Sequence, residues 1–293
     1  MSHGAVATTC PQCGAALMGN EAQCPSCAHH LGAPNVRACS AAAETAALAA
    51  RAKAAEKEAT QRGCSEAAKE FRETIRKESG VVVALPAQVA RQLLADPRSI
   101  YQNYEGLVES GTRTAARPAD DSMRRSVGGL LFGSNANAIR YGVLSLDGSG
   151  PSSYGEVFCR LKDVTIQHRV SFTETNSYTF IDEHALAPGK DIPKGHRAVW
   201  SNRDQLALAK LVKHLKKNQG KKDWARMLLR SSGNRATDDF IEAHIFEGFN
   251  ADSMQSVTTL PLKGMSKTSK LDARIALELF HKRSSAAASG KAP

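Results

Sequence analysis

The stretch FIEAHIF, residues 240–246, predicts a β-strand with two chemically different faces. Successive side chains of a strand point to opposite sides, so positions 241, 243 and 245 share one face, which is entirely apolar. Glu242 and His244 share the opposite face, with a phenylalanine on either side. The apolar face predicts a strand packed on a hydrophobic core. The polar face is compatible with the wall of a cleft or with a solvated edge strand.

Shorter strands and amphipathic helices surround this segment and predict an α+β fold. Val157, Cys159 and Leu161 alternate with the residues of the other face, which predicts a half-buried strand with Cys159 in the core. Strand-like and helix-like segments do not alternate regularly, so a parallel βαβ arrangement is not expected. Further strands are predicted at 139–146, 170–173 and 197–200, and helices at 101–108, 205–217, 270–281 and in the second part of 81–95.

The N-terminal residues 1–33 contain two Cys-x-x-Cys pairs with ten residues between them. Two such turns facing each other place four thiolates at tetrahedral corners, the geometry that Zn²⁺ prefers, and they leave no position open for a substrate. We therefore predict a structural zinc module that resembles a zinc ribbon, with iron in a rubredoxin-like site as the main alternative. The expected ligands are Cys10, Cys13, Cys24 and Cys27.

Residues 34–79 are rich in Ala, Glu, Lys and Arg, a composition with high helix propensity. Their apolar positions are mostly Ala, so we expect an exposed helical spacer that separates the zinc module from a globular domain at 80–283 and leaves the module separable from catalysis. Residues 284–293 consist of Ser, Ala, Gly, Lys and Pro, and predict a disordered tail.

The overall composition favours a soluble chain with acidic partners. Of 293 residues, 42% are hydrophobic, the mean hydropathy is −0.35, and no apolar run is long enough to span a bilayer. No signal-peptide pattern is visible at the N-terminus. The net charge of +10 favours nucleic acid or acidic proteins as partners, and the densest group of lysines lies at 210–222. This group is expected to be the solvated face of its helix.

Four short motifs precede the 240–246 strand in a particular order. They are RYG at 140–142, SYG at 153–155, RVSFTE at 169–174 and NSY at 176–178. Together with the late Glu242, this ordered set resembles the bacterial mono-ADP-ribosyltransferases over roughly residues 100–250. It is similar in particular to effectors that place ADP-ribose on a threonine of host ubiquitin.

The resemblance implies an ADP-ribosyltransferase-like split β-sheet core that uses NAD⁺ as substrate. In this family the late Glu holds the ribose of NAD⁺ and stabilises the positive charge that develops as nicotinamide leaves. The matching positions here imply Glu242, Ser171 and Thr173 as catalytic residues, Asp120, Asp121 or His244 as a base, and Arg140, Tyr141, Ser171, Thr173 and Tyr178 (or Phe180) as NAD⁺ contacts. Arg113 and Arg117 stay as alternatives to Arg140.

Many relatives have Gln or Glu two residues before the catalytic Glu, whereas this chain has Phe240. An arginine acceptor is therefore not expected. The resemblance instead implies a hydroxyl acceptor, a threonine of host ubiquitin above all, and an effector that is made in the bacterial cytoplasm and delivered into a target cell. The alternative is a binding protein in which the zinc ribbon and the Lys-rich helix hold nucleic acid or a protein, next to a non-catalytic α+β domain.

Overall fold

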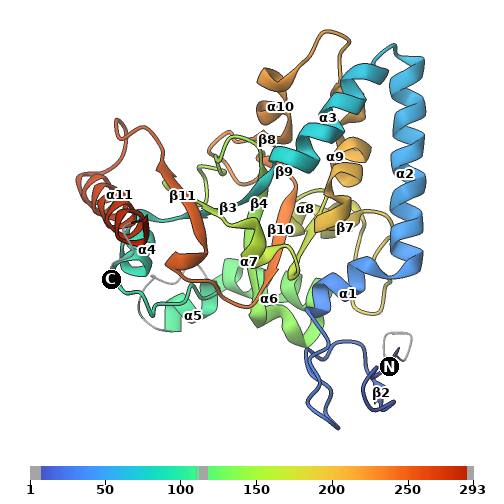
Figure 1. The fold of residues 1–293 in the computed structure, drawn as a ribbon, viewed down its shortest axis with the longest axis horizontal. Coiled ribbons are helices and arrows are strands. Elements are labelled where there is room, and N and C mark those ends of the chain that lie inside the picture. The colour runs from blue at the N-terminus through green and yellow to red at the C-terminus, as the bar shows by residue number, and fades with distance from the viewer. Residues whose placement is uncertain (1–7, 110, 112–117, 289–293) are drawn as a thin grey trace.

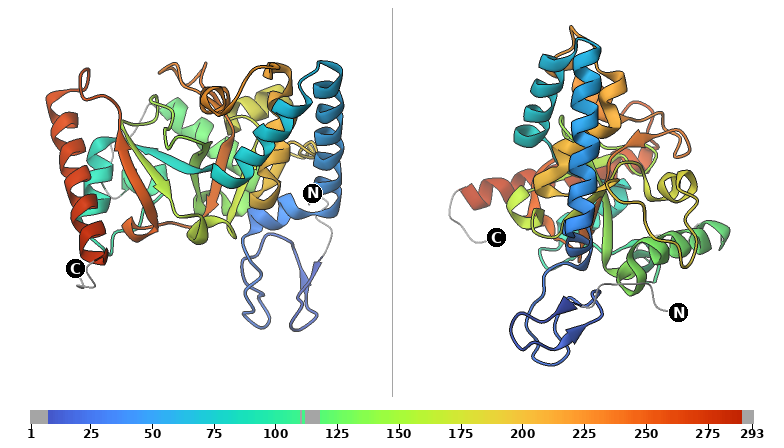
Figure 2. Two further views of the ribbon diagram at one scale, coloured as in Figure 1. Left: turned by 45° about the horizontal axis from the view of Figure 1, so that its top comes forward. Right: turned by 90° about the vertical axis from the view of Figure 1, so that its right-hand side faces the viewer.

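The computed structural model describes residues 8–109, 111 and 118–288, and it has the α+β architecture that the sequence predicts. A seven-stranded antiparallel sheet forms its centre (Figure 1). The N-terminal cysteine module is a small lobe next to α1 (Pro34–Ser40). Helices α2 (Ala42–Gln61) and α11 (Lys267–Ala288) lie at opposite ends of the sheet (Figure 2). Within the described chain, no helix is both long and apolar enough to cross a membrane.

Seven of the described strands form one hydrogen-bonded sheet, and the split-sheet core that the resemblance implies stays a prediction. Strand β3 connects β5 with β4, because residues 80–82 pair with β4 and residues 82–85 pair with β5. The order across the sheet is β11 (Met254–Thr259), β5 (Val157–Leu161), β3 (Gly80–Leu85), β4 (Ile139–Ser145), β10 (Glu242–Phe246), β6 (Val170–Thr173) and β7 (Arg197–Val199).

The two faces of the sheet differ as the 240–246 pattern predicts. Ile241, Ala243 and Ile245 are fully buried in the main hydrophobic core, and Cys159 joins the same core from β5. The opposite face carries smaller apolar clusters together with Glu242 and His244. The remaining helices are α4 (Ala87–Ala95), α5 (Tyr104–Glu109), α6 (Pro118–Phe132), α7 (Asp163–Ile166), α8 (Ser177–Glu183), α9 (Arg203–Leu211) and α10 (Lys221–Leu228).

Residues 34–79 are not the exposed spacer that their composition suggested. They form α1, α2 and α3 (Ser65–Glu78), and the inner faces of α2 and α3 belong to the main core. Phe71 is fully buried, and its ring lies 5.7 Å from that of Trp224 on α10. The many alanines of α2 allow close packing against α9, so their small size favours contact and does not prevent burial. A chain that begins near Ser79 would lack part of its core.

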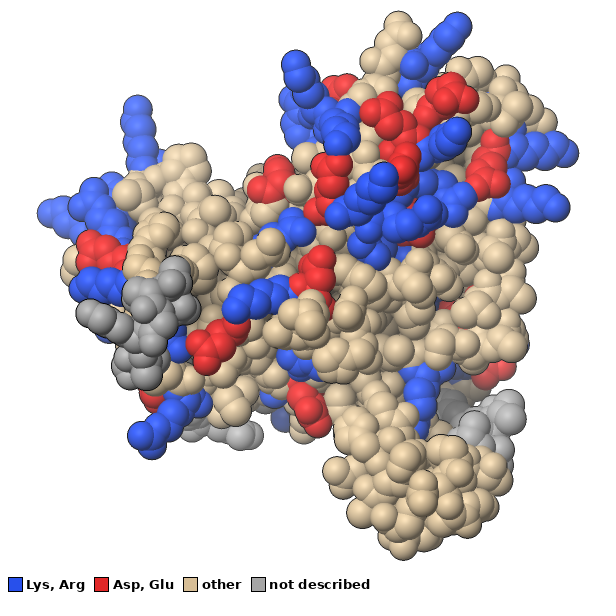
Figure 3. Space-filling model, viewed as in Figure 1, with Lys and Arg blue, Asp and Glu red and all other residues tan. Residues whose placement is uncertain are grey.

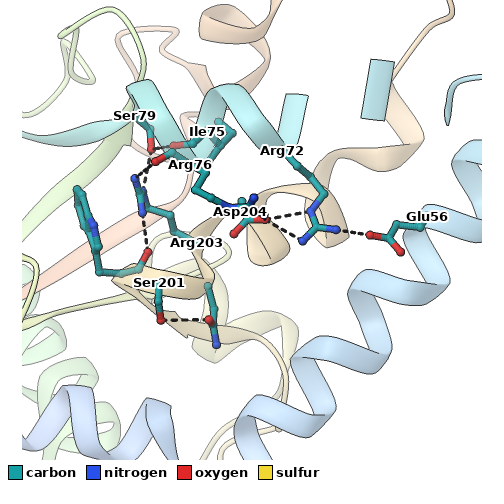
Figure 4. Close-up of polar contacts among 10 residues, drawn as sticks. Glu56, Arg72, Ile75, Arg76, Ser79, Ser201, Arg203 and Asp204 are labelled. Carbon is teal, nitrogen blue, oxygen red and sulfur yellow. Dashed lines mark hydrogen bonds and ion pairs between the residues drawn. The ribbon is translucent and has the colours of Figure 1, made fainter. Parts of the chain in front are cut away.

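An ion-pair network around the buried Asp204 fixes α3 to α9 (Figure 4). Oδ2 of Asp204 accepts from Arg72 Nε at 3.0 Å and from Arg76 NH2 at 2.8 Å. Beside it, Arg203 donates to Ser79 Oγ and to the carbonyl of Arg76, which ends α3 against the start of β3. These bonds attach residues 34–79, the predicted spacer, to the main domain.

Two further predictions need correction at particular residues. The last helix continues to Ala288, so residues 284–288 are helical, because Ala-rich sequence extends a helix that is already nucleated. Residues 289–293 lie outside the described chain. Lys210 does not belong to a solvated face: its ammonium group is buried and bonds Asp239 and the carbonyl of Phe240, and burial lowers its pKa against the opposing effect of Asp239.

The glycines of the RYG and SYG motifs serve close packing of the sheet. A Cβ on Gly142 would lie 2.9 Å from the carbonyl oxygen of Val82, and one on Gly155 would lie 2.1 Å from the carbonyl carbon of Leu85. Both contacts are with the backbone of β3, which cannot move without disturbing the sheet. These two motif positions therefore require glycine for packing.

Candidate functional site

The four N-terminal cysteines lie together in a geometry that can hold a metal ion. The Sγ atoms of Cys10 and Cys27 are 3.7 Å apart, and those of Cys13 and Cys24 are 3.6 Å apart. A tetrahedron with zinc–sulfur bonds of about 2.3 Å has edges of about 3.8 Å, which is close to these two distances, and all four thiols lie within 4.8 Å of one another.

The backbone turns that present these thiols are alike. Each turn closes with a hydrogen bond to the carbonyl of its first cysteine, from Gly14 in one turn and from Ala28 in the other. Both donors have a positive φ, 71° for Gly14 and 56° for Ala28. The module also contacts the main domain: Asn20 donates to Ser134 Oγ at 3.0 Å, and Asn135 donates to the Asn20 carbonyl at 2.8 Å.

On the other side of the sheet from the main core, Glu242 is buried and held by three donors on one oxygen. Its Oε2 accepts from the Ser177 backbone N–H at 2.7 Å, from the Ser177 hydroxyl, and from Nε2 of His244 at 3.0 Å. Nε2 of His244 also lies 3.0 Å from the Ser177 hydroxyl, so Ser177, His244 and Oε2 form one hydrogen-bonded cluster. Among the described residues, Oε1 has no hydrogen bond, although solvent reaches 8% of the side chain. Oε2 is thus fixed, and Oε1 is left for a ligand.

The local sequence explains why Ser177 meets Glu242. Asn176 caps α8 and accepts a hydrogen bond from the backbone of Thr179, which places Ser177 in the first turn, where its backbone N–H has no partner within the helix. The NSY motif therefore acts through its serine, a residue that the sequence analysis quoted without giving it a role. The capping pattern Asn-Ser-x-Thr was the signal that could have found it.

Ser171 and Thr173 lie on the face of Glu242, as the sequence predicts, but they brace the backbone. Thr173 is directly opposite Glu242 and Ser171 is opposite His244 in the β6–β10 register. The Thr173 hydroxyl donates to the carbonyl of Thr175 at 2.7 Å. Ser171 accepts from the side-chain amide of Asn35 at 3.0 Å, and Asn35 also donates to the His244 carbonyl at 2.8 Å. Sequence gave no sign that Asn35, directly after the cysteine module, reaches this site.

Arg140 does not join Glu242. It is opposite Ile245 in the β4–β10 register, so it lies on the other face of the sheet. Its guanidinium donates to the carbonyls of Tyr101 and Asn137, at 3.1 and 2.8 Å. Strand alternation, with Gly142 and Leu144 on the same side, explains the position. Arg140 is therefore separated from Glu242 by the sheet, its role as an NAD⁺ contact stays a prediction, and the alternatives Arg113 and Arg117 lie outside the described residues.

The predicted aromatic residues divide into two groups. Tyr141 lies opposite His244, with 5.5 Å between the ring centroids, and Tyr178 follows Ser177 with 54% of its surface exposed. Both are exposed, and Tyr141 shares the sheet face of Glu242 and His244. Phe180 is fully buried and unable to stack on a ligand. The candidate base His244 is also buried, so it can position Glu242 but cannot meet an acceptor directly.

Asp120 is in α6, which borders this face, but its side chain and that of Asp121 are outside what the structure describes.

Tyr154 of the SYG motif lies within the electrostatic reach of Glu242. Burial raises the pKa of Tyr154 to about 12, and the charge of Glu242 adds to the increase while Arg235 and Arg124 oppose it. The guanidinium of Arg235 lies 4.8 Å from the Tyr154 ring centroid. Arg235 and Arg124 are thus cationic groups near Tyr154, a residue that Glu242 also influences, and sequence reasoning identified neither arginine.

A small cavity of about 20 Å³ adjoins the site between α1, α6 and the sheet, lined in part by Asn35, Cys39, Ser171 and His244. It is large enough for one water molecule and far too small for a nucleotide.

No model of a known protein family matches this sequence, and no curated protein matches it either.

Proposed function

We propose that this protein is an NAD⁺-dependent mono-ADP-ribosyltransferase that modifies a hydroxyl group of a target protein, with threonine of host ubiquitin as the expected acceptor. One observation carries the proposal: Glu242 is buried on the polar face of the sheet, and three donors hold one of its oxygens while the other has no hydrogen bond within the described chain. The ordered motifs that resemble this enzyme family support it.

The chemistry needs a fixed negative charge next to the ribose of NAD⁺. Nicotinamide leaves with the electron pair of the broken glycosidic bond, and positive charge grows on the ribose. Oε1 of Glu242 would accept the ribose 2′-hydroxyl, while Ser177 and His244 keep the carboxylate oriented, so little reorganisation is needed as the charge develops. Arg235 and Arg124 are further cations that could bind the phosphates.

The acceptor hydroxyl then attacks the ribose carbon and loses its proton to a base. Asp120 stays the predicted base. Phe240 is fully buried beneath the strand, so no polar side chain two residues before Glu242 orients a guanidinium acceptor. This supports the proposed hydroxyl acceptor. Delivery of the enzyme from a bacterium into a target cell belongs to the same proposal.

The decisive experiment compares Glu242→Gln with the wild-type chain. Purified protein is incubated with NAD⁺ and ubiquitin, and nicotinamide release and ubiquitin mass are measured. Loss of the charge at unchanged shape should reduce transfer by roughly 10²–10³-fold, which corresponds to about 3–4 kcal/mol of transition-state stabilisation. Glu278→Gln, at an exposed position of α11, is the matched control and should retain full activity. Equal activity of Glu242→Gln and wild type would contradict the proposal.

For the four N-terminal cysteines, we propose Zn²⁺ with a structural role. All four donors are thiols of the protein, so the ion has no open coordination position for catalysis.

Nucleic-acid binding is the second candidate function. Lys and Arg side chains gather over α2, α3 and α10 on the face seen in Figure 3. Many are paired there: Lys77 with Glu73, Lys221 with Glu78, and Arg72 with Glu56. Such pairing reduces the charge that phosphates would meet, which favours the transferase proposal. A gel-shift assay at low salt tests the alternative.

A further inference from the structure

A second group of metal-ligating side chains lies at the edge of the sheet, away from the cysteines. Glu174 follows β6, His184 ends α8, and His196 precedes β7. One ligand atom from each of the three lies within 4.8 Å of the others. His196 Nδ1 is in contact with Glu174 Oε1, and His184 Nε2 is 3.7 Å from the same oxygen. Three elements of the fold thus bring two imidazoles and a carboxylate to one point.

His184 supplies an independent sign that the group is made for a ligand. Its Nε2 is buried and has no hydrogen-bond partner, since 3.7 Å to Glu174 is too long for a hydrogen bond. The ring is held by aromatic neighbours, with its centroid 4.6 Å from Phe180 and 4.5 Å from His196. A buried imidazole nitrogen without a partner costs free energy unless another group binds it. A metal ion between the three residues would remove this cost.

The distances and surroundings suit a small divalent ion. Zinc bonds to nitrogen and oxygen are about 2.0–2.2 Å long, which gives ligand–ligand edges of about 3.4 Å in a tetrahedral site. The 3.7 Å from His184 to Glu174 needs a small contraction, and the hydrogen-bond contact between His196 and Glu174 has to open to the same edge when the ion replaces the proton. The other oxygen of Glu174 accepts from Arg51 NH2 at 2.8 Å, and Arg51 also donates to the Gly195 carbonyl. Arg51 thus orients the carboxylate from the outer shell, as partners of metal ligands do.

We propose that Glu174, His184 and His196 form a second Zn²⁺ site, with two imidazoles and one carboxylate as ligands and a fourth position open to water. The ion replaces the proton between His196 and Glu174 and gives His184 Nε2 a partner. Because α8 begins at Ser177 and His184 directly follows its last residue, the ion fixes the end of the helix whose beginning binds Glu242. The site is independent of the N-terminal cysteines and of the proposed transferase activity.

The test is the amount of Zn²⁺ bound per chain. Wild-type protein is brought to equilibrium with micromolar Zn²⁺ by dialysis, and its metal content is measured by mass spectrometry. We expect two ions per chain. His184→Gln and His196→Gln should each bind one, whereas His281→Gln, an exposed histidine of α11, should bind two. A mercurial that blocks thiols should release one ion from the wild type and leave the second bound.

Cobalt gives a readout that does not depend on variants. Titration of the wild type with Co²⁺ should show thiolate charge-transfer bands for one equivalent, and d–d bands without further charge transfer for a second. One ion per wild-type chain, all of it released by the mercurial, would overturn the proposal. So would two ions per chain in both His184→Gln and His196→Gln, since the second ion would then lie elsewhere.

Discussion

Asp204→Asn tests whether residues 34–79 are an integral part of the domain. Asp204 lies on α9 with 2% of its side chain exposed, and its Oδ2 accepts from two arginines of α3. The Asn variant keeps the shape of the side chain and removes its charge. Arg72 and Arg76 then lose the anion that holds them against α9.

The structure sets the expected size of the effect. Removal of one partner from a buried ion pair typically destabilises a protein by about 3–5 kcal/mol. Here the loss should be near the lower limit, about 3 kcal/mol, because Arg72 keeps Glu56 as a partner and more than half of Arg76 is exposed. Glu73→Gln is the control. It removes an exposed pair with Lys77 on the same helix, and such pairs contribute about 0–1 kcal/mol.

Urea unfolding followed by circular dichroism measures both variants. We expect one cooperative transition in which Asp204→Asn has a clearly lower midpoint and an unchanged dependence on urea concentration. If Asp204→Asn and Glu73→Gln gave the same small change, the pair would not couple α3 to α9. A separate early transition for residues 34–79 would likewise refute the reasoning and restore the spacer.

Three further outcomes are expected. Gly155→Ala should lower the free energy of unfolding by about 3 kcal/mol, because its Cβ would overlap the Leu85 backbone, whereas Gly129→Ala in α6, which has open space, should be neutral or stabilising in the same urea assay. Because the pKa of Tyr154 is raised in the folded protein, its contribution to stability is complete below about pH 10 and is lost as the pH rises toward 12. The difference in tyrosinate absorbance between wild type and Tyr154→Phe measures this pKa. The pKa should be lower in the Glu242→Gln variant, because the Glu242 charge helps to raise it. Chelation of the metal at the four cysteines should make residues 8–33 the first site of limited proteolysis while the circular dichroism of the main domain persists; cleavage at an unchanged rate would contradict a structural metal.

The elements that sequence predicted well are those with a local signal. Alternation in 240–246 identified both faces of β10, and Cys-x-x-Cys spacing identified the four thiols, because each pattern is complete within a few residues. The motif order also brought Ser171 and Thr173 to the face of Glu242. In each case the predicted feature depends on the alternation of residues along a strand or on the spacing of a motif, and both can be read directly from a sequence.

The errors share a different physical cause. Whether the alanines of α2 face solvent depends on α9, more than 100 residues away, and no local pattern carries that contact. Motif order alone placed Arg140 with Glu242, although its place beside Gly142 and Leu144 already put it on the apolar side of β4. The Glu174, His184 and His196 group escaped notice because its members belong to three separate elements that only the fold brings together.

Asn35 shows how a residue outside every motif can connect the cysteine module to the candidate site. It is the second residue of α1, which begins directly after that module, and its side-chain amide bonds both Ser171 and the carbonyl of His244. On the module side, Arg37 of the same helix donates to the carbonyls of Gly19 and Glu21. One short helix therefore bonds the module through Arg37 and the strands that carry Glu242 and Ser171 through Asn35. A metal that orders the cysteine turns also fixes the start of this helix, so the module is better understood as an anchor for one wall of the site than as an appendage.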